Sequence, residues 1–288
     1  METMKDLDRA EAFRKGVLIL KGAGIPNPAL DVSVLLGHTT GDAPDTVLLE
    51  RNRVLTIGES ARFAALIERR CERETVSRLV GTKEFFSRAF RTSPDVLDPR
   101  PETEILVERA LDSLGRMTGC PRVLDVGTGS GIIAVTLSLV DPRISAVATD
   151  ISSVALKLAH ANARDHGVSN RVRFVRTDLA GCFSETVRFD LLVSNPPYIP
   201  RGEYPALPDE VRLGDPMSAL VPGPEGTEFF EPLAMAAGKL LRPGGVLLVE
   251  TGAGQGAFVE KTFRKSGLTD VTTFPDLAGI GRVVRGQK

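Results

Sequence analysis

The chain has 288 residues, a length typical of one large domain or of a large domain joined to a small one. Hydrophobic residues make up 42% and charged residues 25%, as in ordinary globular proteins, which argues against long disordered stretches. The formal net charge of −1 provides no overall electrostatic attraction to a nucleic-acid backbone.

The cysteines and the N-terminus indicate where the protein resides. Three widely spaced cysteines fit a reducing compartment better than a disulfide framework. The first residues are charged and amphipathic, without the apolar core of a signal peptide, and no apolar run has the length of a membrane span. We therefore expect a cytoplasmic protein that does not bind membranes.

Residues 1–76 have helical periodicity without strand-like alternation, which predicts a small N-terminal helical bundle domain. Asn27 is a natural N-cap residue, and Pro28 suits the first position of a helix. Helices are expected at residues 7–24, 27–38, 44–51 and 58–74.

The segment that follows links this bundle to the rest of the chain. In residues 79–94, hydrophobic residues alternate around Ser87 and Arg88, which predicts a β-hairpin within a linker of residues 77–98. The main domain is then expected at residues 99–288. It would begin with a helix that has Pro101 just inside its first turn, beside acidic residues that favour the positive end of the helix dipole.

After Cys120 the sequence alternates between strand and helix patterns. Strands are expected at residues 122–127, 145–150, 172–178, 189–195, 245–251, 270–274 and 282–286, and helices at residues 131–140, 152–167, 226–241 and 256–267. This alternation predicts an α/β fold with a doubly wound, mostly parallel seven-stranded sheet and helices on both faces. The short loop before the last strand predicts that this strand is antiparallel.

A glycine loop, "VLDVGTGSGIIAV", joins the first of these strands to a helix through Gly127, Gly129 and Gly131. Glycine permits a sharp turn and a close approach of a ligand, and the helix N-terminus can receive an anion. The spacing differs from the dinucleotide pattern and favours a smaller anion, such as a carboxylate, over a pyrophosphate. A purely structural turn is the alternative.

Two acidic residues end the next two strands, Asp150 in "VATD" and Asp178 in "RTD". A carboxylate at the first position can accept hydrogen bonds from both ribose hydroxyls, and one at the second can meet the amino group of an adenine. All three features lie at the carboxyl edge of the predicted sheet, which indicates a nucleoside site. Capping of the following helices by the two aspartates is the alternative.

The fourth strand ends in "LLVSNPPYIP", with Asn195, two prolines and Tyr198. The Asn195 carbonyl can accept a hydrogen bond and its NH₂ group can donate one, while Pro196 and Pro197 stiffen the backbone. Tyr198 could form a flat wall that stacks on an amide or a base. The loop is therefore interpreted as a rigid receptor for a planar NH₂ group, with an ordinary proline-rich turn as the alternative.

"DVGTGSG" followed by "NPPY" is similar to the class I S-adenosylmethionine-dependent methyltransferases that act on amide or exocyclic amine nitrogen. Further segments resemble the HemK/PrmC family, among them "LVGTKEFFSRAF", "LDPRPETEILVERAL", "EVRLGDP" and "LRPGGVLLVETGAGQG". With "GIPNPALDVSVLLGH" near the N-terminus, the resemblance covers nearly the whole chain. It implies methylation of the side-chain amide nitrogen of the glutamine in the Gly-Gly-Gln motif of class I peptide chain release factors.

The resemblance also implies roles for particular residues. S-adenosyl-L-methionine would be the methyl donor, with S-adenosylhomocysteine as product. The implied cofactor-binding residues are Gly127, Thr128, Gly129, Ser130, Gly131, Asp150, Asp178, Leu179 and Asn195, and the implied catalytic residues are Asn195, Pro196, Pro197 and Tyr198. Leu179 departs from the aromatic residue common in relatives. No cysteine or histidine cluster has metal-ligand spacing, so no metal is expected.

Three other functions remain open at this stage. The same tetrapeptide could hold the amino group of adenine in a nucleic acid, although the near-zero charge argues against direct nucleic-acid binding. The substrate could instead be a glutamine of a ribosomal protein, in which case the N-terminal helices would discriminate. A binding module without catalysis is the third possibility, and the intact glycine loop, Asp150 and NPPY argue against it.

Overall fold

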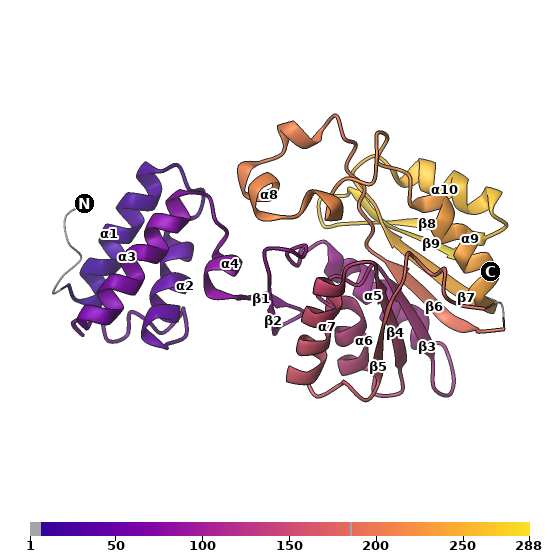
Figure 1. Ribbon diagram of the computed structural model, residues 1–288, viewed down its shortest axis with the longest axis horizontal. Helices are drawn as coiled ribbons and strands as arrows, with labels where there is room; N and C mark the ends of the chain where they lie inside the picture. The colour runs from indigo at the N-terminus through magenta and orange to yellow at the C-terminus, as the bar shows by residue number, and fades with distance from the viewer. Residues whose placement is uncertain (1–6, 185) are drawn as a thin grey trace. The chain divides into compact units, whose positions relative to one another are not determined.

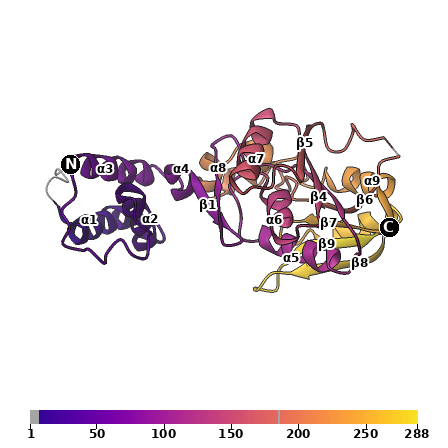
Figure 2. The same cartoon turned by 90° about the horizontal axis from the view of Figure 1, so that it is seen from below.

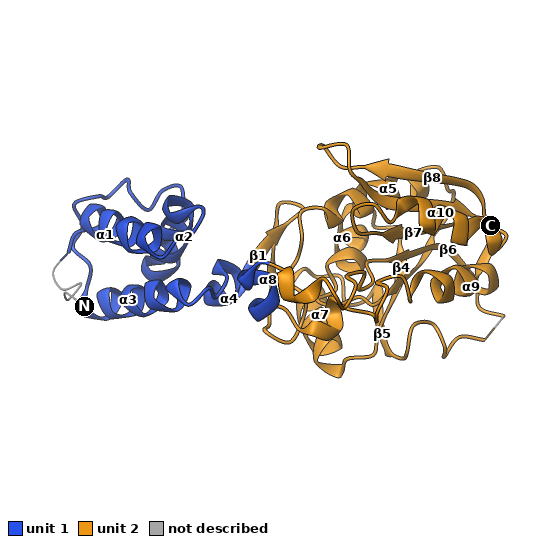
Figure 3. Ribbon diagram, turned by 90° about the horizontal axis from the view of Figure 1, so that it is seen from above, with its two compact units in different colours: residues 1–82, 208–214 blue, residues 83–207, 215–288 orange. Residues whose placement is uncertain are grey.

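The computed structural model describes residues 7–184 and 186–288, which form two compact units. Of the described residues, one unit contains 7–82 and 208–214, and the other contains 83–184, 186–207 and 215–288 (Figure 3). Among the described residues, no helix combines the length and the apolar character that crossing a membrane requires.

The first unit is a helical bundle. Its helices are α1 (Arg9–Gly22), α2 (Pro28–Thr40), α3 (Ile57–Cys71), α4 (Val76–Val80) and α8 (Asp209–Gly214). Helices α1 and α3 each start with a capping box, with Asp8 and Thr56 as the N-cap residues. Each N-cap side chain accepts a hydrogen bond from a backbone N–H that the first helical turn leaves unpaired. Leu20 of α1, Leu35 of α2 and Phe63 of α3 are fully buried at the centre. Sequence periodicity did not predict α4 or α8.

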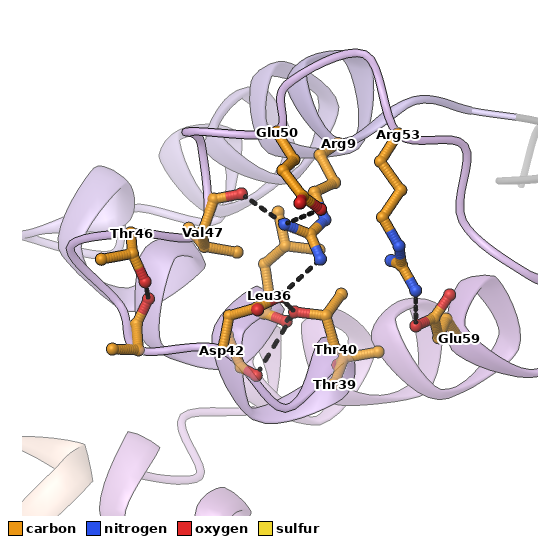
Figure 4. Close-up of polar contacts among 12 residues, drawn as sticks. Arg9, Leu36, Thr39, Thr40, Asp42, Thr46, Val47, Glu50, Arg53 and Glu59 are labelled. Carbon is orange, nitrogen blue, oxygen red and sulfur yellow. Dashed lines mark hydrogen bonds and ion pairs between the residues drawn. The ribbon is translucent and has the colours of Figure 1, made fainter.

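The helix predicted at residues 44–51 is wrong, because this segment consists of turns. The buried Arg9 guanidinium donates to the Val47 carbonyl at 3.2 Å, so this carbonyl is not directed along a helix (Figure 4). Arg9 also pairs with Asp42 and, at 3.6 Å, with Glu50. Burying an arginine requires such partners, and they hold the turns against α1.

The β-hairpin is present, formed by β1 (Thr82–Phe85) and β2 (Arg88–Arg91). Its turn is at Phe86 and Ser87, which have φ values of 52° and 57°, so the turn lies one residue earlier than expected. Positive φ at both central residues is the geometry that two-residue hairpin turns prefer. The helix expected from Pro101 is α5 (Thr103–Leu114), which begins two residues later.

The second unit contains the predicted seven-stranded sheet. Its strands are β3 (Arg122–Val126), β4 (Ser145–Asp150), β5 (Val172–Arg176), β6 (Phe189–Ser194), β7 (Leu241–Glu250), β8 (Thr269–Pro275) and β9 (Gly281–Gln287). The order across the sheet is β5-β4-β3-β6-β7-β9-β8. The first five strands along this order are parallel, and β9 is antiparallel to both neighbours, which confirms the predicted fold class.

Helices cover both faces of the sheet (Figures 1 and 2). They are α5, α6 (Ile132–Val140) and α7 (Ser153–Asp165) on one face and α9 (Phe230–Leu240) and α10 (Gly256–Lys265) on the other. In β6, Leu191 and Val193 pack into the core beneath α5, α6 and α7, and Leu192 packs into the core beneath α9 and α10. Side chains of a strand alternate between the two faces of the sheet in this way. Burial of one such side chain contributes roughly 1.5–3 kcal/mol.

The sheet also positions the functional site. The chain winds outward from β3 through β4 to β5, then returns to place β6 on the other side of β3. Ligands of doubly wound folds bind at the carboxyl ends of the strands where the winding reverses. In this protein the winding reverses between β3 and β6. The glycine loop follows β3 directly, and Asn195 follows β6 directly.

Candidate active site

A cleft opens in the second unit at the carboxyl ends of β3, β4, β5 and β6. It brings together most of the residues that the sequence singled out, although they come from four separate segments. The predicted residues that line it are Gly127, Thr128, Gly129, Ser130, Asp150, Asp178, Leu179, Asn195, Pro196 and Pro197. Gly131 and Tyr198 do not line it.

The three glycines of the loop have two structural roles. Gly127 and Gly129 have φ values of 72° and 57°, and a Cβ atom on Gly127 would meet no other atom within 4 Å. These two positions therefore leave backbone exposed to a ligand. A Cβ atom on Gly131 would lie 2.9 Å from the Cβ of Ala159, so Gly131 allows α6 to approach α7.

Sequence reasoning missed Asp125, a fully buried acid in β3 below the glycine loop. Its Oδ2 accepts hydrogen bonds from the Thr128 hydroxyl at 2.6 Å and from the Ala134 N–H of α6 at 3.2 Å. Its Oδ1 has no partner among the described residues. Burial raises the pKa of Asp125 to about 7, the two hydrogen bonds lower it, and the charge of Asp150 raises it further.

Replacing Asp125 by asparagine is expected to flatten the pH dependence of stability. Because the folded-state pKa of about 7 exceeds the ordinary value of 3.8, this carboxyl stabilises the fold fully below about pH 4. That contribution is lost as the pH rises to about 7. Relative to the wild type, the free energy of unfolding of Asp125→Asn should rise by about 4 kcal/mol between pH 4 and pH 8.

Urea unfolding of both proteins at pH 4 and pH 8, without added ligand, measures this difference. The comparison isolates Asp125, because every other titrating group is present in both proteins. An equal pH dependence in wild type and variant would show that Asp125 is ionised in the folded protein throughout this range.

Asp150 holds the glycine loop as well as facing the cleft. Its Oδ2 accepts the Gly129 N–H at 2.9 Å, and its Oδ1 accepts the Ser152 N–H at 2.8 Å. Ser152, rather than Asp150, is the N-cap of α7, since its hydroxyl accepts the Ala155 N–H. Each Asp150 oxygen has a further lone pair for a ligand.

Asp178 and Leu179 line the cleft beside Asp150. Leu179 has a φ value of 49°, an uncommon conformation for a non-glycine residue. Its carbonyl accepts a hydrogen bond from the Thr149 hydroxyl at 3.0 Å, which holds this turn at the end of β4. The aliphatic side chain of Leu179 lines the cleft at a position for which the resemblance implied contact with the cofactor.

In the NPPY loop, Asn195 is fixed by a residue that the sequence did not single out individually. Its Nδ2 donates to the hydroxyl oxygen of Thr103, the first residue of α5, at 3.0 Å. Thr103 lines the cleft but is only 1% exposed. This bond leaves the Asn195 carbonyl oxygen as the acceptor available to a ligand.

Tyr198 lies behind the loop, which does not support its predicted role as a flat wall of the cleft. Its hydroxyl points to Glu250, the last residue of β7, and donates to Oε1 at 3.4 Å. Burial, and secondarily the charge of Glu250, raises the pKa of Tyr198. The phenol therefore stays protonated and can continue to donate.

The backbone of the loop is fixed from behind by Gln255. Its Nε2 donates to the Tyr198 carbonyl at 2.9 Å and to the Gly226 carbonyl at 3.2 Å, and its Oε1 accepts the Gly252 N–H at 2.9 Å. Gly226 lies so close that a Cβ atom on it would be 2.6 Å from the Tyr198 carbonyl oxygen. The tetrapeptide therefore has little freedom to move.

The segment "RPETE" has structural and cleft-lining roles. Arg100 lines the cleft and pairs with the buried Asp215, which also accepts the Asp98 N–H at 2.9 Å. Glu104 accepts the N–H of Phe86 at 2.7 Å and so holds the hairpin turn. The cleft also includes a wall of residues 95–100, most of which belong to the segment "LDPRPETEILVERAL".

Solved structures with related folds support the description of the fold. A methyltransferase from Pyrococcus furiosus is 18% identical, with a TM-score of 0.51, over 72% of this chain and 91% of that one. The catalytic domain of hMettl16, in complex with a MAT2A 3′UTR hairpin, is 17% identical, with a TM-score of 0.57, over 82% and 83%. The chain thus has the class I methyltransferase fold.

Sequence comparisons define the family. Residues 93–205 match the model "Methyltransferase small domain", and residues 11–81 match "PrmC N-terminal domain". The release factor glutamine methyltransferase of Cereibacter sphaeroides is 42% identical over 96% of each chain. That of Nitratidesulfovibrio vulgaris is 41% identical over 92% of this chain and 90% of its own. The protein belongs to the release factor glutamine methyltransferase family.

Proposed function

We propose that the protein transfers a methyl group from S-adenosyl-L-methionine to the side-chain amide nitrogen of the glutamine in the Gly-Gly-Gln motif of class I peptide chain release factors. The observation that carries the proposal is one cleft that combines the glycine loop, Asp150 and the Asn195 carbonyl. The names of the relatives support the choice of substrate. The relatives match most of this chain, so the similarity includes the N-terminal helices.

The cleft fits the proposed methyl donor. Gly127 and Gly129 leave room against the backbone, and Asp150 retains lone pairs for ribose hydroxyls. The unpartnered Oδ1 of Asp125 places an acidic group beneath the loop, where an ammonium group would be favoured. Asp178 and Leu179 would lie beside the adenine. When bound, S-adenosylmethionine supplies an electrophilic methyl group.

The residues of the NPPY loop would orient the acceptor amide. Asn195 Oδ1 and the Pro196 carbonyl each accept one N–H of the glutamine, which aims its nitrogen into the cleft. Their negative partial charge stabilises this nitrogen as it becomes cationic during methyl transfer. Tyr198 contributes from behind, through its bonds to Glu250 and Gln255. No general base is needed before transfer, because the methylated amide readily releases its proton.

The N-terminal helices would recognise the body of the release factor. This role for residues 1–76 accounts for a helical unit that has its own core. The family model "PrmC N-terminal domain" matches residues 11–81 of this unit. The cleft would then receive only the glutamine loop. Discrimination between a release factor and a ribosomal protein would lie in this unit.

Methyl-group incorporation from labelled S-adenosylmethionine distinguishes the candidate substrates. Purified release factor, DNA and ribosomal proteins are incubated separately with the protein at equal concentration. We expect label in the release factor, with the other two at the level of a reaction without enzyme. Preferential labelling of DNA or of a ribosomal protein would overturn the proposal.

A further inference from the structure

The side chains that line the cleft are acidic at every charged position except one. The acidic ones are Asp95, Asp98, Asp150 and Asp178. Among the described residues that line the cleft, Arg100 has the only positively charged side chain. A guanidinium group is not deprotonated in proteins. An anionic group of a bound ligand would therefore be attracted most strongly to Arg100.

The glycine loop offers an anion few donors, because most of its backbone N–H groups are used within the protein. Backbone carbonyl oxygens accept three of them at 2.8–2.9 Å, those of Gly127, Thr128 and Gly131. The N–H of Gly129 donates to Asp150 at 2.9 Å. Within residues 127–131, all of which the structure describes, only the Ser130 N–H has no acceptor. A carboxylate at this loop therefore requires a donor from another segment.

Arg100 is anchored at one nitrogen and free at the other two. Its Nη2 donates to Oδ2 of Asp215, whose side chain is only 3% exposed. A buried carboxylate requires such a charged partner, so this end of the guanidinium is fixed. Nε and Nη1 have no partner among the described residues, and the Arg100 side chain is 27% exposed. N–H groups of Arg100 thus remain available to a ligand.

The wall that carries Arg100, residues 95–100, borders the glycine loop. The Cγ1 atom of Val96 lies 3.7 Å from the position that a Cβ atom on Gly129 would take. Both segments line the one cleft. A group bound at the glycine loop therefore lies beside this wall.

We propose that Arg100 binds the carboxylate of the amino-acid part of the methyl donor. The proposal rests on the proposed function for the presence of that donor, which carries a carboxylate and an ammonium group at neutral pH. Arg100 supplies the charge that the glycine loop lacks, and the unpartnered Oδ1 of Asp125 favours the ammonium group. The two charged groups of the amino acid thus have separate partners of opposite charge.

Two ligands that differ only in the carboxylate test the proposal. S-adenosylhomocysteine carries this group, and its decarboxylated analogue keeps the thioether and the ammonium group. In calorimetric titrations of the full chain, we expect S-adenosylhomocysteine to bind about 10–100-fold more tightly than the analogue, as a hydrogen bond between charged groups should provide. Equal affinities of the wild type for the two ligands would overturn the proposal without any variant.

Arg100→Gln removes the charge and keeps an NH₂ group that can donate to Asp215. The affinity for S-adenosylhomocysteine should fall by about 10–100-fold, while that for the decarboxylated analogue stays within about 3-fold of the wild type. The ratio of the two affinities does not depend on the fraction of folded protein, so it remains informative if the variant is less stable. An equal loss for both ligands, or an unchanged affinity for S-adenosylhomocysteine, would overturn the proposal.

Arg242→Gln is the matched control, because Arg242 also pairs with a buried aspartate but lies outside the cleft. Its Nη2 donates to Asp190 at 2.8 Å, and the Asp190 side chain is 6% exposed. Its affinities for both ligands should equal those of the wild type, and a change in their ratio as large as in Arg100→Gln would contradict the proposal. These titrations contain no release factor. A protein that binds both ligands as expected but methylates no release factor would overturn only the proposed function.

Discussion

Asn195→Ala is expected to lower kcat for methyl transfer by at least about 10³-fold while S-adenosylmethionine still binds. The substitution removes the side-chain acceptor that the NPPY loop presents to the cleft and leaves the Thr103 hydroxyl without its donor. The glycine loop and Asp150, which carry most of the proposed cofactor contacts, are unchanged. Initial rates with saturating release factor, together with calorimetric titration of the cofactor, measure the two effects separately.

Asn170→Ala is the matched control for this variant, because Asn170 is exposed and lies outside the cleft. Its kcat should equal that of the wild type. If Asn195→Ala turned over at a rate near that of the wild type, Asn195 would not be the group that holds the substrate amide, and the proposed mechanism would fall.

Gly226→Ala is expected to disrupt the NPPY loop from behind. Gly226 has a φ value of 75°, and the new Cβ atom would lie 2.6 Å from the Tyr198 carbonyl oxygen and 2.8 Å from Pro200 Cδ. Strain and overpacking together should destabilise the protein by about 2–4 kcal/mol. A shift of the loop by about 1 Å should lower kcat by roughly 10²-fold. Chemical denaturation and initial rates measure these changes.

Gly238→Ala in α9 is the control for adding a methyl group to a glycine. A Cβ atom on Gly238 would meet nothing within 4 Å, and the residue has helical geometry. This variant should be as stable as the wild type or more stable by up to about 1 kcal/mol, with unchanged kcat. A loss of activity in Gly238→Ala equal to that in Gly226→Ala would refute the argument from close approach.

The sheet could be predicted from sequence because its signals are local. The central strands β3, β6 and β7 each contain a short apolar run, as parallel strands buried on both faces require. The helix expected at residues 44–51 was wrong because a distant residue decides the outcome. Arg9 takes the Val47 carbonyl, and no periodicity within the segment can reveal this contact.

In the cleft, too, the features with local sequence signals could be predicted and those that depend on distant residues could not. The glycine loop and Asn195 each follow a strand directly, and Asp150 is the last residue of β4. Strand order alone places such residues at one edge of the sheet. Thr103 and Asn195 are far apart in sequence and meet through the packing of α5 against β6. The position of Tyr198 behind the loop likewise depends on the contacts of its side chain with the interior, which the motif does not encode.

The most direct test of the proposed function locates the methyl group itself. A class I release factor is incubated with the protein and methyl-labelled S-adenosylmethionine, and the peptide containing Gly-Gly-Gln is sequenced by tandem mass spectrometry. We predict one labelled methyl group on the side-chain amide of that glutamine, and none after reaction with Asn195→Ala. An unlabelled glutamine, in a reaction where the protein demonstrably binds the cofactor, would contradict the proposed function.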